Sequence, residues 1–212
     1  MIKLAEAINR EYLNAKITVV ISDKHCVGIA RAVDLAIPTQ VIERQKFPTQ
    51  REHEAAIQDA ITDAKADYVF LAGYMAVLRA EFTNYFAGRL LNIHPSLLPE
   101  FRGLDTHQRA INANASRHGA TVHLVSAKLD DGPIILQAEI PVSPKDDANN
   151  LAAKVLELEH QLYPFVLKKL CDGKLMLTAD KVIWQKEEIV LQIELALAGS
   201  HFSQALRWPD SP

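Results

Sequence analysis

The stretch LLNIHPSLLP, residues 90–99, decides how the rest of the chain is interpreted. Its first residues are apolar and favour a short buried strand. Pro95 ends that strand, because proline has no N–H for a sheet hydrogen bond. Side chains alternate between the two faces of a strand, so Asn92 and His94 point the same way. We therefore predict an amide and an imidazole side by side where a strand runs into a loop.

The end of this strand is a candidate position for a functional site. Ligands of open α/β sheets bind beyond the carboxyl ends of the strands. Asn92 and His94 together can donate hydrogen bonds and a proton to a developing oxyanion. Asp130, in a turn between two later strands, would orient the His94 ring and favour its charged form. Asp-Asp-Gly-Pro is also an ordinary turn sequence, and a strand-end Asn and His can simply cap loop backbone. The spacing alone leaves these interpretations open.

Strands and helices alternate through the first half of the chain. The continuous apolar runs 17–21 and 68–72 predict strands buried on both faces. This alternation favours a Rossmann-like, mostly parallel sheet flanked by helices. The other elements predicted here are helices at 2–14, 27–35 and 80–86, a strand at 39–42, and a helix to about residue 65 that opens with the capping box Thr49–Glu52.

The second half predicts antiparallel additions to that sheet. We expect strands at 121–125 and 134–142, a helix at 106–113, and a long helix at 148–170 capped by Asp147 and ended by Gly173. A hairpin follows at 175–178 and 182–184. Residues 1–180 are expected to form one domain, with 181–212 as an extension. Within it, 187–198 could be helix or strand, and 207–212 is expected to be a loose tail.

Composition excludes several classes of protein. The 212 residues are 49% hydrophobic, enough for a sizeable core, and the net charge of -3 offers no electrostatic case for nucleic acid. No apolar run reaches membrane-spanning length, and the N-terminus does not read as a secretory signal. The two cysteines fit a reducing cytoplasm. None of the eight histidines has metal-ligand spacing, so no metal is expected. We expect His107 and His123 to line the pocket or to satisfy core hydrogen bonds.

Five blocks together resemble the phosphoribosylglycinamide formyltransferases, the folate-dependent enzymes of purine (IMP) biosynthesis. They are RLLNIHPSLLP (89–99), GLDTHQRA (103–110), HGATVHLV (118–125), LDDGPIILQA (129–138) and ELEHQLYP (157–164), and the similarity spans about residues 2–176. The resemblance implies the formyltransferase fold. It implies that the glycine amine of 5-phosphoribosylglycinamide attacks the formyl carbon of 10-formyltetrahydrofolate. It further implies small-molecule substrates, no nucleic acid or membrane partner, no metal, and a monomer or homodimer.

The same resemblance assigns roles by position. His94 would be the general acid/base, Asn92 a hydrogen-bond donor to the same oxygen, and Asp130 the partner that holds His94. The folate would contact Arg51, Met75, Ala76, Val77, Leu78, Asn92, Ser126, Ala127, Lys128, Leu129 and Asp130. The choice between Gln50 and Arg51 for the folate tail stays open. The ribonucleotide would contact Leu156, Glu157, Leu158 and Glu159, with Glu159 accepting from the ribose hydroxyls. Ordinary packing at a strand end and a solvated helix face are the simpler interpretations.

The chain departs from the family most at its start. The family opens with an apolar strand and a Gly/Ser-rich loop for the substrate phosphate, whereas Met1 falls where that loop passes into the first helix. We expect a misassigned start, and expect the runs 17–21 and 68–72 to flank the position of that strand. Two alternatives are a formyltetrahydrofolate deformylase, which reads HHSFLP rather than HPSLLP, and a non-catalytic folate-binding remnant.

Overall fold

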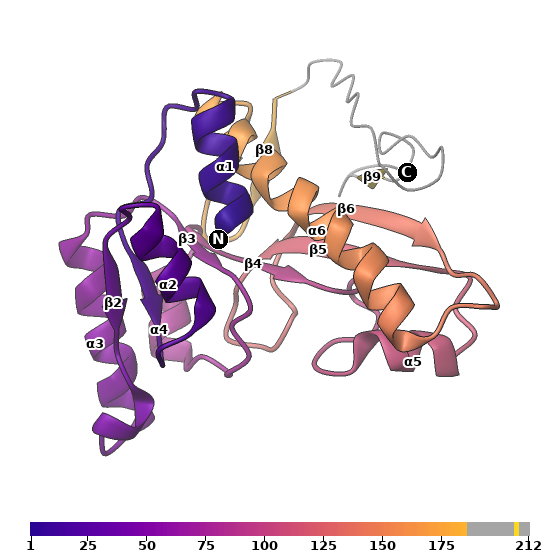
Figure 1. The fold of residues 1–212 in the computed structure, drawn as a ribbon, viewed down its shortest axis with the longest axis horizontal. Coiled ribbons are helices and arrows are strands. Elements are labelled where there is room, and N and C mark those ends of the chain that lie inside the picture. Colours follow the sequence, from indigo (N-terminus) through magenta and orange to yellow (C-terminus); the bar gives the residue numbers. More distant parts are fainter. Residues whose placement is uncertain (186–205, 208–212) are drawn as a thin grey trace.

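The computed structural model describes residues 1–185 and 206–207, with parallel strands in the first half and antiparallel strands in the second. Figure 1 shows β1, β2 and helices α2–α4 on one side, β5, β6 and α5 on the other, and β3 and β4 between them. The helices are α1 (Ile2–Arg10), α2 (Val27–Asp34), α3 (Gln50–Asp63), α4 (Ala80–Tyr85), α5 (Thr106–Asn112) and α6 (Ala148–Cys171), with a short 3-10 helix η1 (Arg44–Lys46). The strands are β1 (Val20–Ser22), β2 (Thr39–Val41), β3 (Val69–Leu71), β4 (Leu90–His94), β5 (Arg117–Leu124), β6 (Ile134–Pro141), β7 (Leu175–Leu177), β8 (Val182–Trp184) and β9 (Leu206–Arg207).

The central sheet has the order β3-β4-β5-β6-β9. Strands β3 and β4 are parallel, and each later neighbour in this sheet is antiparallel. Strands β1 and β2 form a separate parallel pair, and β7 and β8 form a separate hairpin. The predicted fold class is confirmed: a parallel, Rossmann-like first half carries antiparallel additions, and helices flank the sheet.

Local sequence signals set the helix ends as predicted. The Thr49 hydroxyl accepts from the Glu52 N–H, and the Glu52 carboxylate accepts from the Thr49 N–H, which completes the capping box of α3. Asp147 accepts from the Asn150 N–H at the start of α6. After α6 the chain turns at Gly173, whose φ of +67° favours glycine.

The main core lies between α6 and the antiparallel strands. Five residues on one face of α6 are fully buried: Leu151, Val155, Leu158, Leu162 and Val166. They pack with buried residues of β5 and β6 such as Val122 and Leu136. Burying each of these side chains stabilises the fold by about 1.5–3 kcal/mol. The Tyr163 hydroxyl lies 3.0 Å from each of the carbonyls of Leu71 and Leu91, which ties α6 to β3 and β4.

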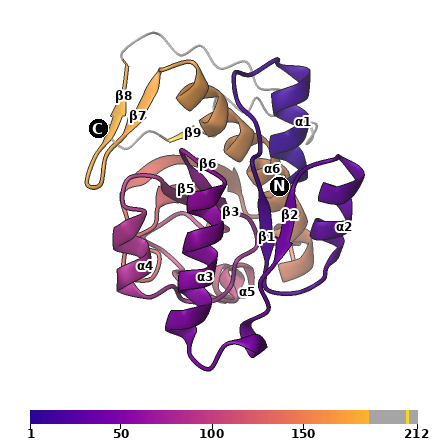
Figure 2. The ribbon, with the colours of Figure 1, turned by 90° about the vertical axis from the view of Figure 1, so that its left-hand side faces the viewer.

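One prediction about burial is wrong. Residues 17–21 and 68–72 were expected to form strands buried on both faces, but β1 and β3 span three residues each and all six are only half-buried. The reason is that β1 and β3 do not pair with each other. A cavity of about 1360 Å³ lies between them, lined by Ile21, Phe70 and Met1 among others. Figure 2 shows β1 and β2 side by side with α2 next to them.

The backbone of β1 shows which groups face this cavity. The Val20 N–H donates to the Pro38 carbonyl, and the Ser22 carbonyl accepts from the Ile42 N–H, both toward β2. Since alternate residues of a strand point their backbone groups to opposite sides, those of Ile21 face the cavity. The opening is therefore bordered by polar strand edges as well as apolar side chains, and a strand parallel to both β1 and β3 would fit it.

The remaining bounds differ modestly from prediction. Strand β5 begins four residues earlier than expected, at Arg117, because His118 and Gly119 continue the pairing with β6 despite interrupting the apolar run. Helix α1 ends at Arg10 rather than at residue 14. The predicted domain boundary at residue 180 falls inside the β7–β8 hairpin. The Trp184 ring N–H donates to the Ile135 carbonyl, which attaches this hairpin to β6.

Part of the predicted extension lies beyond what can be compared. The expected element at 187–198 falls outside the described residues, as does the predicted tail apart from Arg207, which pairs with Gln137 through β9. The division into 1–180 and 181–212 stays a prediction. Among the helices of residues 1–185, none combines the length and apolar character needed to cross a membrane.

Candidate active site

Strand β4 delivers His94 to a buried position at its carboxyl end. The His94 side chain is 7% exposed. Its Nε2 lies 3.0 Å from the Phe101 carbonyl, and because a carbonyl only accepts, Nε2 carries a proton. Its Nδ1 lies 3.4 Å from Asp130 Oδ2. Both ring nitrogens therefore face acceptor oxygens, which fixes the orientation of the ring between the loop and the β5–β6 turn.

Asp130 reaches His94 from the turn between β5 and β6. Its φ of +47° is left-handed, a conformation that Asp tolerates better than most residues. Its Oδ2 accepts from the Gly103 N–H at 2.8 Å, and its side chain is 9% exposed. The turn passes very close to β5, since a Cβ added to Gly132 would lie 1.8 Å from the Leu124 carbonyl oxygen. Glycine at 132 is therefore required for this path of the chain.

Asn92 is oriented by His123, which lies opposite it on β5. The Nδ1 of His123 faces the Leu124 carbonyl at 2.9 Å and must carry the proton, so Nε2 accepts from the Asn92 amide at 3.3 Å. Burial lowers the pKa of His123, which keeps the ring neutral. Although Nε2 lies 3.8 Å from Asp130 Oδ1, a neutral ring forms no ion pair there. One N–H of the Asn92 amide is left for a ligand.

The structure thus brings Asn92, His94 and Asp130 to one place, with His123 between two of them. From the sequence, His123 fits either a pocket residue or a core residue, because no motif distinguishes the two. The backbone groups of Phe101 and Gly103 were not predicted, because a carbonyl or N–H has no sequence signal. The one hint is Gly103 itself, whose φ of +78° favours glycine.

The loop after β3 presents three of its four predicted folate residues. Met75, Ala76 and Val77 are exposed, whereas Leu78 is 8% exposed and packs in the core with Phe82. For Leu78 the simpler interpretation, packing at a strand end, fits its position. The apolar surface of Met75 and Val77 is free to meet a flat ligand.

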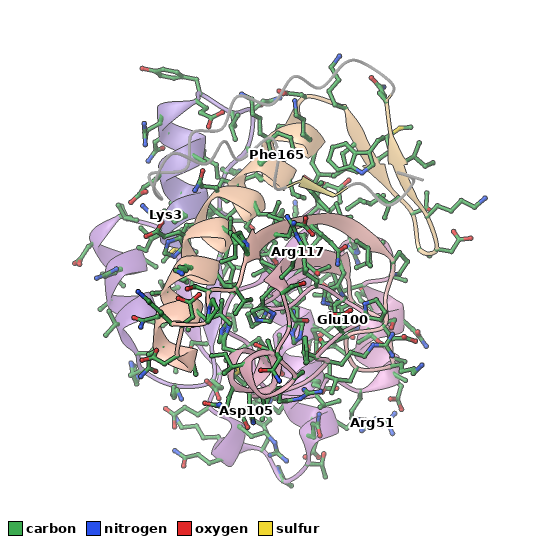
Figure 3. All side chains as sticks on the ribbon, turned by 90° about the vertical axis from the view of Figure 1, so that its right-hand side faces the viewer. Lys3, Arg51, Glu100, Asp105, Arg117 and Phe165 are labelled. Atoms are coloured by element: carbon green, nitrogen blue, oxygen red, sulfur yellow. The ribbon has the colours of Figure 1, made fainter. Side chains whose placement is uncertain are left out.

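Helix α3 anchors that loop. The Gln50 amide donates to the Val77 carbonyl at 2.7 Å and to Glu54 Oε1 at 2.8 Å. Glu54 Oε1 also accepts from the Arg79 N–H at 3.1 Å. The Gln50 side chain is therefore engaged within the protein. Arg51 is exposed at the edge of the molecule, as Figure 3 shows, and is the freer of the two for a ligand tail.

The predicted residues of the β5–β6 turn form its outer surface. Ala127, Lys128 and Leu129 are exposed. The Ser126 hydroxyl donates to the Lys128 carbonyl at 3.1 Å, and Lys128 Nζ lies 2.9 Å from Asp131 Oδ2. These internal bonds hold the turn that carries Asp130.

Helix α6 separates the four predicted ribonucleotide residues. Leu158 is fully buried in the main core, so its side chain is unavailable, whereas Leu156 and Glu157 are exposed. Glu159 is half-buried and has no hydrogen bond or ion pair to any residue that the structure describes. Burial raises the pKa of Glu159 to about 7. A carboxylate in this state gains from hydroxyl donors brought by a ligand.

Glu159 is connected to the strand of the catalytic residues through Tyr163. It is one helical turn before Tyr163, whose hydroxyl pKa is raised by burial and further by the negative charge of Glu159. Tyr163 contacts the carbonyls of Leu71 and Leu91, and Leu71 pairs with Asn92 across β3 and β4. Glu159 and Asn92 therefore belong to the same end of the sheet.

His107 and His118 form a second histidine pair beside Phe101. His107 Nδ1 and His118 Nε2 are 3.2 Å apart, and the His118 ring meets the Phe101 ring edge-on. Burial lowers the pKa of both rings, that of His118 to about 4, so the pair is neutral. In the part of the chain that the structure describes, no group of three or more His, Cys, Asp and Glu side chains gathers as a metal ion would require.

Comparisons with known proteins show which family the chain belongs to. The profile of the formyl transferase family matches residues 1–167. The phosphoribosylglycinamide formyltransferase of Haemophilus influenzae is 43% identical over 175 residues, which is 82% of each protein. The solved structure of the Coxiella burnetii phosphoribosylglycinamide formyltransferase superposes with a TM-score of 0.81 at 36% identity and covers 86% of this chain and 87% of that one.

A formyltetrahydrofolate deformylase from Pseudomonas syringae shares the fold less specifically. Its structure superposes with a TM-score of 0.79, but at 25% identity, and the match covers 87% of this chain and only 61% of the deformylase. The higher identity and the fuller mutual coverage both lie with the transferases. The chain therefore belongs to the formyl transferase family, within its phosphoribosylglycinamide formyltransferase branch.

Proposed function

We propose that this chain transfers the formyl group of 10-formyltetrahydrofolate to the glycine amine of 5-phosphoribosylglycinamide. The observation that carries the proposal is the meeting of Asn92, His94 and Asp130 at the carboxyl end of β4. An amide donor, an imidazole and a carboxylate can stabilise a developing oxyanion and move protons, which are the two tasks of an acyl transfer to an amine. The folate, when bound, supplies the formyl group.

Each of the three residues has a distinct task. The free N–H of Asn92 donates to the formyl oxygen as negative charge develops there, and His123 keeps that amide in position. His94 can donate a proton to the same oxygen. Its Nε2 proton is held by the Phe101 carbonyl, so Nδ1, at a long 3.4 Å from Asp130 Oδ2, is the ring nitrogen that can exchange a proton.

The proton balance of the reaction uses this pair. The attacking amine loses a proton as its bond to carbon forms, and the folate nitrogen gains one as its bond to carbon breaks. His94 and Asp130 together can accept the first proton and return one to the leaving nitrogen. Asp130 is poised for this because the Gly103 N–H holds its carboxylate toward His94.

The surrounding residues fit the two substrates. Exposed Met75, Ala76 and Val77 offer an apolar surface for the folate ring, and the turn of Ser126–Leu129 offers backbone groups. The carboxylate of Glu159, which has no partner among the described residues, suits the two hydroxyls of a ribose. We propose Arg51, rather than Gln50, for the folate tail, because the Gln50 amide is engaged with Val77 and Glu54.

The test measures formyl transfer with the purified chain, both substrates, and Asp130→Asn against wild type. We expect product formation in the wild type, and a fall in kcat of at least about 100-fold in Asp130→Asn. Asp59→Asn, on the exposed face of α3, is the control and should retain activity. Release of free formate without the amine product would instead identify a hydrolase. Folate binding with neither reaction would identify the non-catalytic alternative.

Compartment and assembly are further parts of this proposal. Cys26 and Cys171 are free thiols, which supports a reducing compartment, and we place the protein in the cytoplasm. We propose a monomer or homodimer that acts on small molecules, and sedimentation of the purified protein distinguishes the two states.

A further inference from the structure

We propose that Arg109 is a positioning residue that holds His94 and Asp130 in their reactive arrangement. It acts through the loop of residues 101–104, and the inference rests on the proposed function. Arg109 lies on α5 and is exposed. Figure 3 labels Glu100 and Asp105, which flank the loop on either side.

The loop contacts both catalytic side chains through its backbone. The Phe101 carbonyl accepts from His94 Nε2 at 3.0 Å, and the Gly103 N–H donates to Asp130 Oδ2 at 2.8 Å. The orientation of His94 and the direction of the Asp130 carboxylate therefore depend on where two backbone groups of one short loop lie. Since both groups belong to the same segment, a movement of the loop changes both contacts together.

The loop also needs support from outside. Phe101 has a φ of +52°, a left-handed value that is unfavourable for a bulky residue, and Asp105 has a φ of +56°, which Asp tolerates better. Such conformations persist only where surrounding contacts determine them. The loop therefore depends on neighbouring groups to hold the path that presents the Phe101 carbonyl and the Gly103 N–H.

Arg109 provides that support at both sides of Gly103. Its Nη1 donates to the Arg102 carbonyl at 2.6 Å and to the Leu104 carbonyl at 3.2 Å. Its guanidinium carbon lies 5.7 Å from the centre of the Phe101 ring. A planar, permanently charged guanidinium is suited to hold two carbonyls and an aromatic face at once. One side chain thus fixes the residues before and after the N–H that binds Asp130.

Other contacts keep the loop folded without Arg109. Arg102 forms an ion pair with Asp131, and Phe101 packs against His118. Loss of Arg109 is therefore expected to loosen the loop rather than to unfold the protein. That expectation separates a positioning role from a purely structural one.

The test compares Arg109→Ala, Arg109→Lys and the control Gln108→Ala. Gln108 is the adjacent exposed residue of α5, and its side chain bonds only to Asn112 among the contacts described. A displacement near 1 Å at a reacting group costs on the order of 100-fold in rate. For Arg109→Ala we expect a fall of about 10- to 100-fold in kcat, KM values within about threefold of wild type, and a melting temperature close to that of the control. Arg109→Lys should recover part of the loss, because an ammonium can reach one carbonyl.

A second readout does not depend on activity. In ¹⁵N NMR spectra of the ligand-free protein, the Nε2 signal of His94 should shift, and its proton should exchange faster with water, in Arg109→Ala but not in Gln108→Ala. The inference is overturned if Arg109→Ala matches Gln108→Ala in both kcat and the His94 signal, or if its loss of activity follows loss of folded protein. If the wild type transfers no formyl group, the proposed function fails, and the NMR comparison alone decides the role of Arg109.

Discussion

Replacing Gly132 by alanine should impair the reaction by moving the turn that carries Asp130. The new Cβ would lie 1.8 Å from the Leu124 carbonyl oxygen and 2.8 Å from its carbon, whereas real Cβ contacts essentially never fall below 3.0 Å. The two backbone segments must therefore separate by more than about 1 Å, since neither is a flexible side-chain end. Overpacking of this kind costs about 1–3 kcal/mol of stability. The shift moves Asp130 relative to His94, and a misplacement of about 1 Å costs on the order of 100-fold in rate.

A matched control lies in the same hairpin. A Cβ on Gly119 would lie 1.9 Å from the Ala138 carbonyl oxygen, so Gly119→Ala introduces a comparable clash away from the Asp130 turn. The assay is kcat per folded enzyme, with thermal melting of each variant. Both variants should melt at lower temperature, and only Gly132→Ala should lose about 100-fold in kcat. The reasoning is refuted if Gly132→Ala keeps wild-type kcat, or if Gly119→Ala loses as much.

Four further outcomes can be measured. Asn92→Ala should lower kcat by about 100- to 1,000-fold with little change in either KM, because one donor to the developing charge is lost; an unchanged kcat would contradict that role. The pKa of Glu159 is about 7 in the folded chain and 4.5 ordinarily, so the folded chain binds this proton more tightly than the unfolded chain. The free energy of unfolding should therefore fall as the pH rises from 4.5 to about 7. Glu159→Gln should remove this fall, seen in melting curves from pH 4 to 8, and should weaken ribonucleotide binding about tenfold by calorimetry. Burial lowers the pKa of His118 to about 4 from the ordinary 6.5, so the unfolded chain binds this proton at a higher pH than the folded chain. About 3 kcal/mol of stability should therefore be lost as the pH falls from 6.5 to 4. His118→Gln should reduce this loss of stability, and an unchanged loss would show that His118 is not its cause. Met1 lines the cavity between β1 and β3. An extended apolar segment joined to Met1 should therefore raise the melting temperature, by roughly 2–4 °C for each kcal/mol of added folding stability, and a polar segment of equal length should not.

The helix ends and the strand of residues 90–94 were predicted from local sequence rules. The capping box at Thr49, the cap at Asp147 and the turn at Gly173 depend on a few neighbouring residues, and all three lie where the sequence placed them. The strand of residues 90–94 and its shared face for Asn92 and His94 follow from alternation along a strand. Such features are readable because the groups that form them are close in the chain.

Burial was predicted less well, because it depends on neighbours that are distant in the chain. The apolar runs 17–21 and 68–72 predict fully buried strands, but full burial requires a neighbouring segment on each side of the strand. Among the described strands, β1 pairs only with β2 and β3 only with β4, so their residues are half-buried beside a cavity. Leu78 and Leu158, expected at ligand surfaces, are core residues for the same reason: the packing of α4 and α6 decides which way they face.

The chemistry of the site divides in the same way. The order of residues along the chain places an amide and an imidazole at the end of β4 and a carboxylate in the β5–β6 turn, and the resemblance named Asn92, His94 and Asp130. The tertiary structure was needed to show that Asp130 lies 3.4 Å from His94 and that a neutral His123 orients Asn92. It also decided that the loop held by Arg109 supplies a carbonyl and an N–H to the catalytic pair. Protonation states and backbone contacts depend on distances between segments far apart in the chain, and side-chain alternation within one strand does not encode those distances.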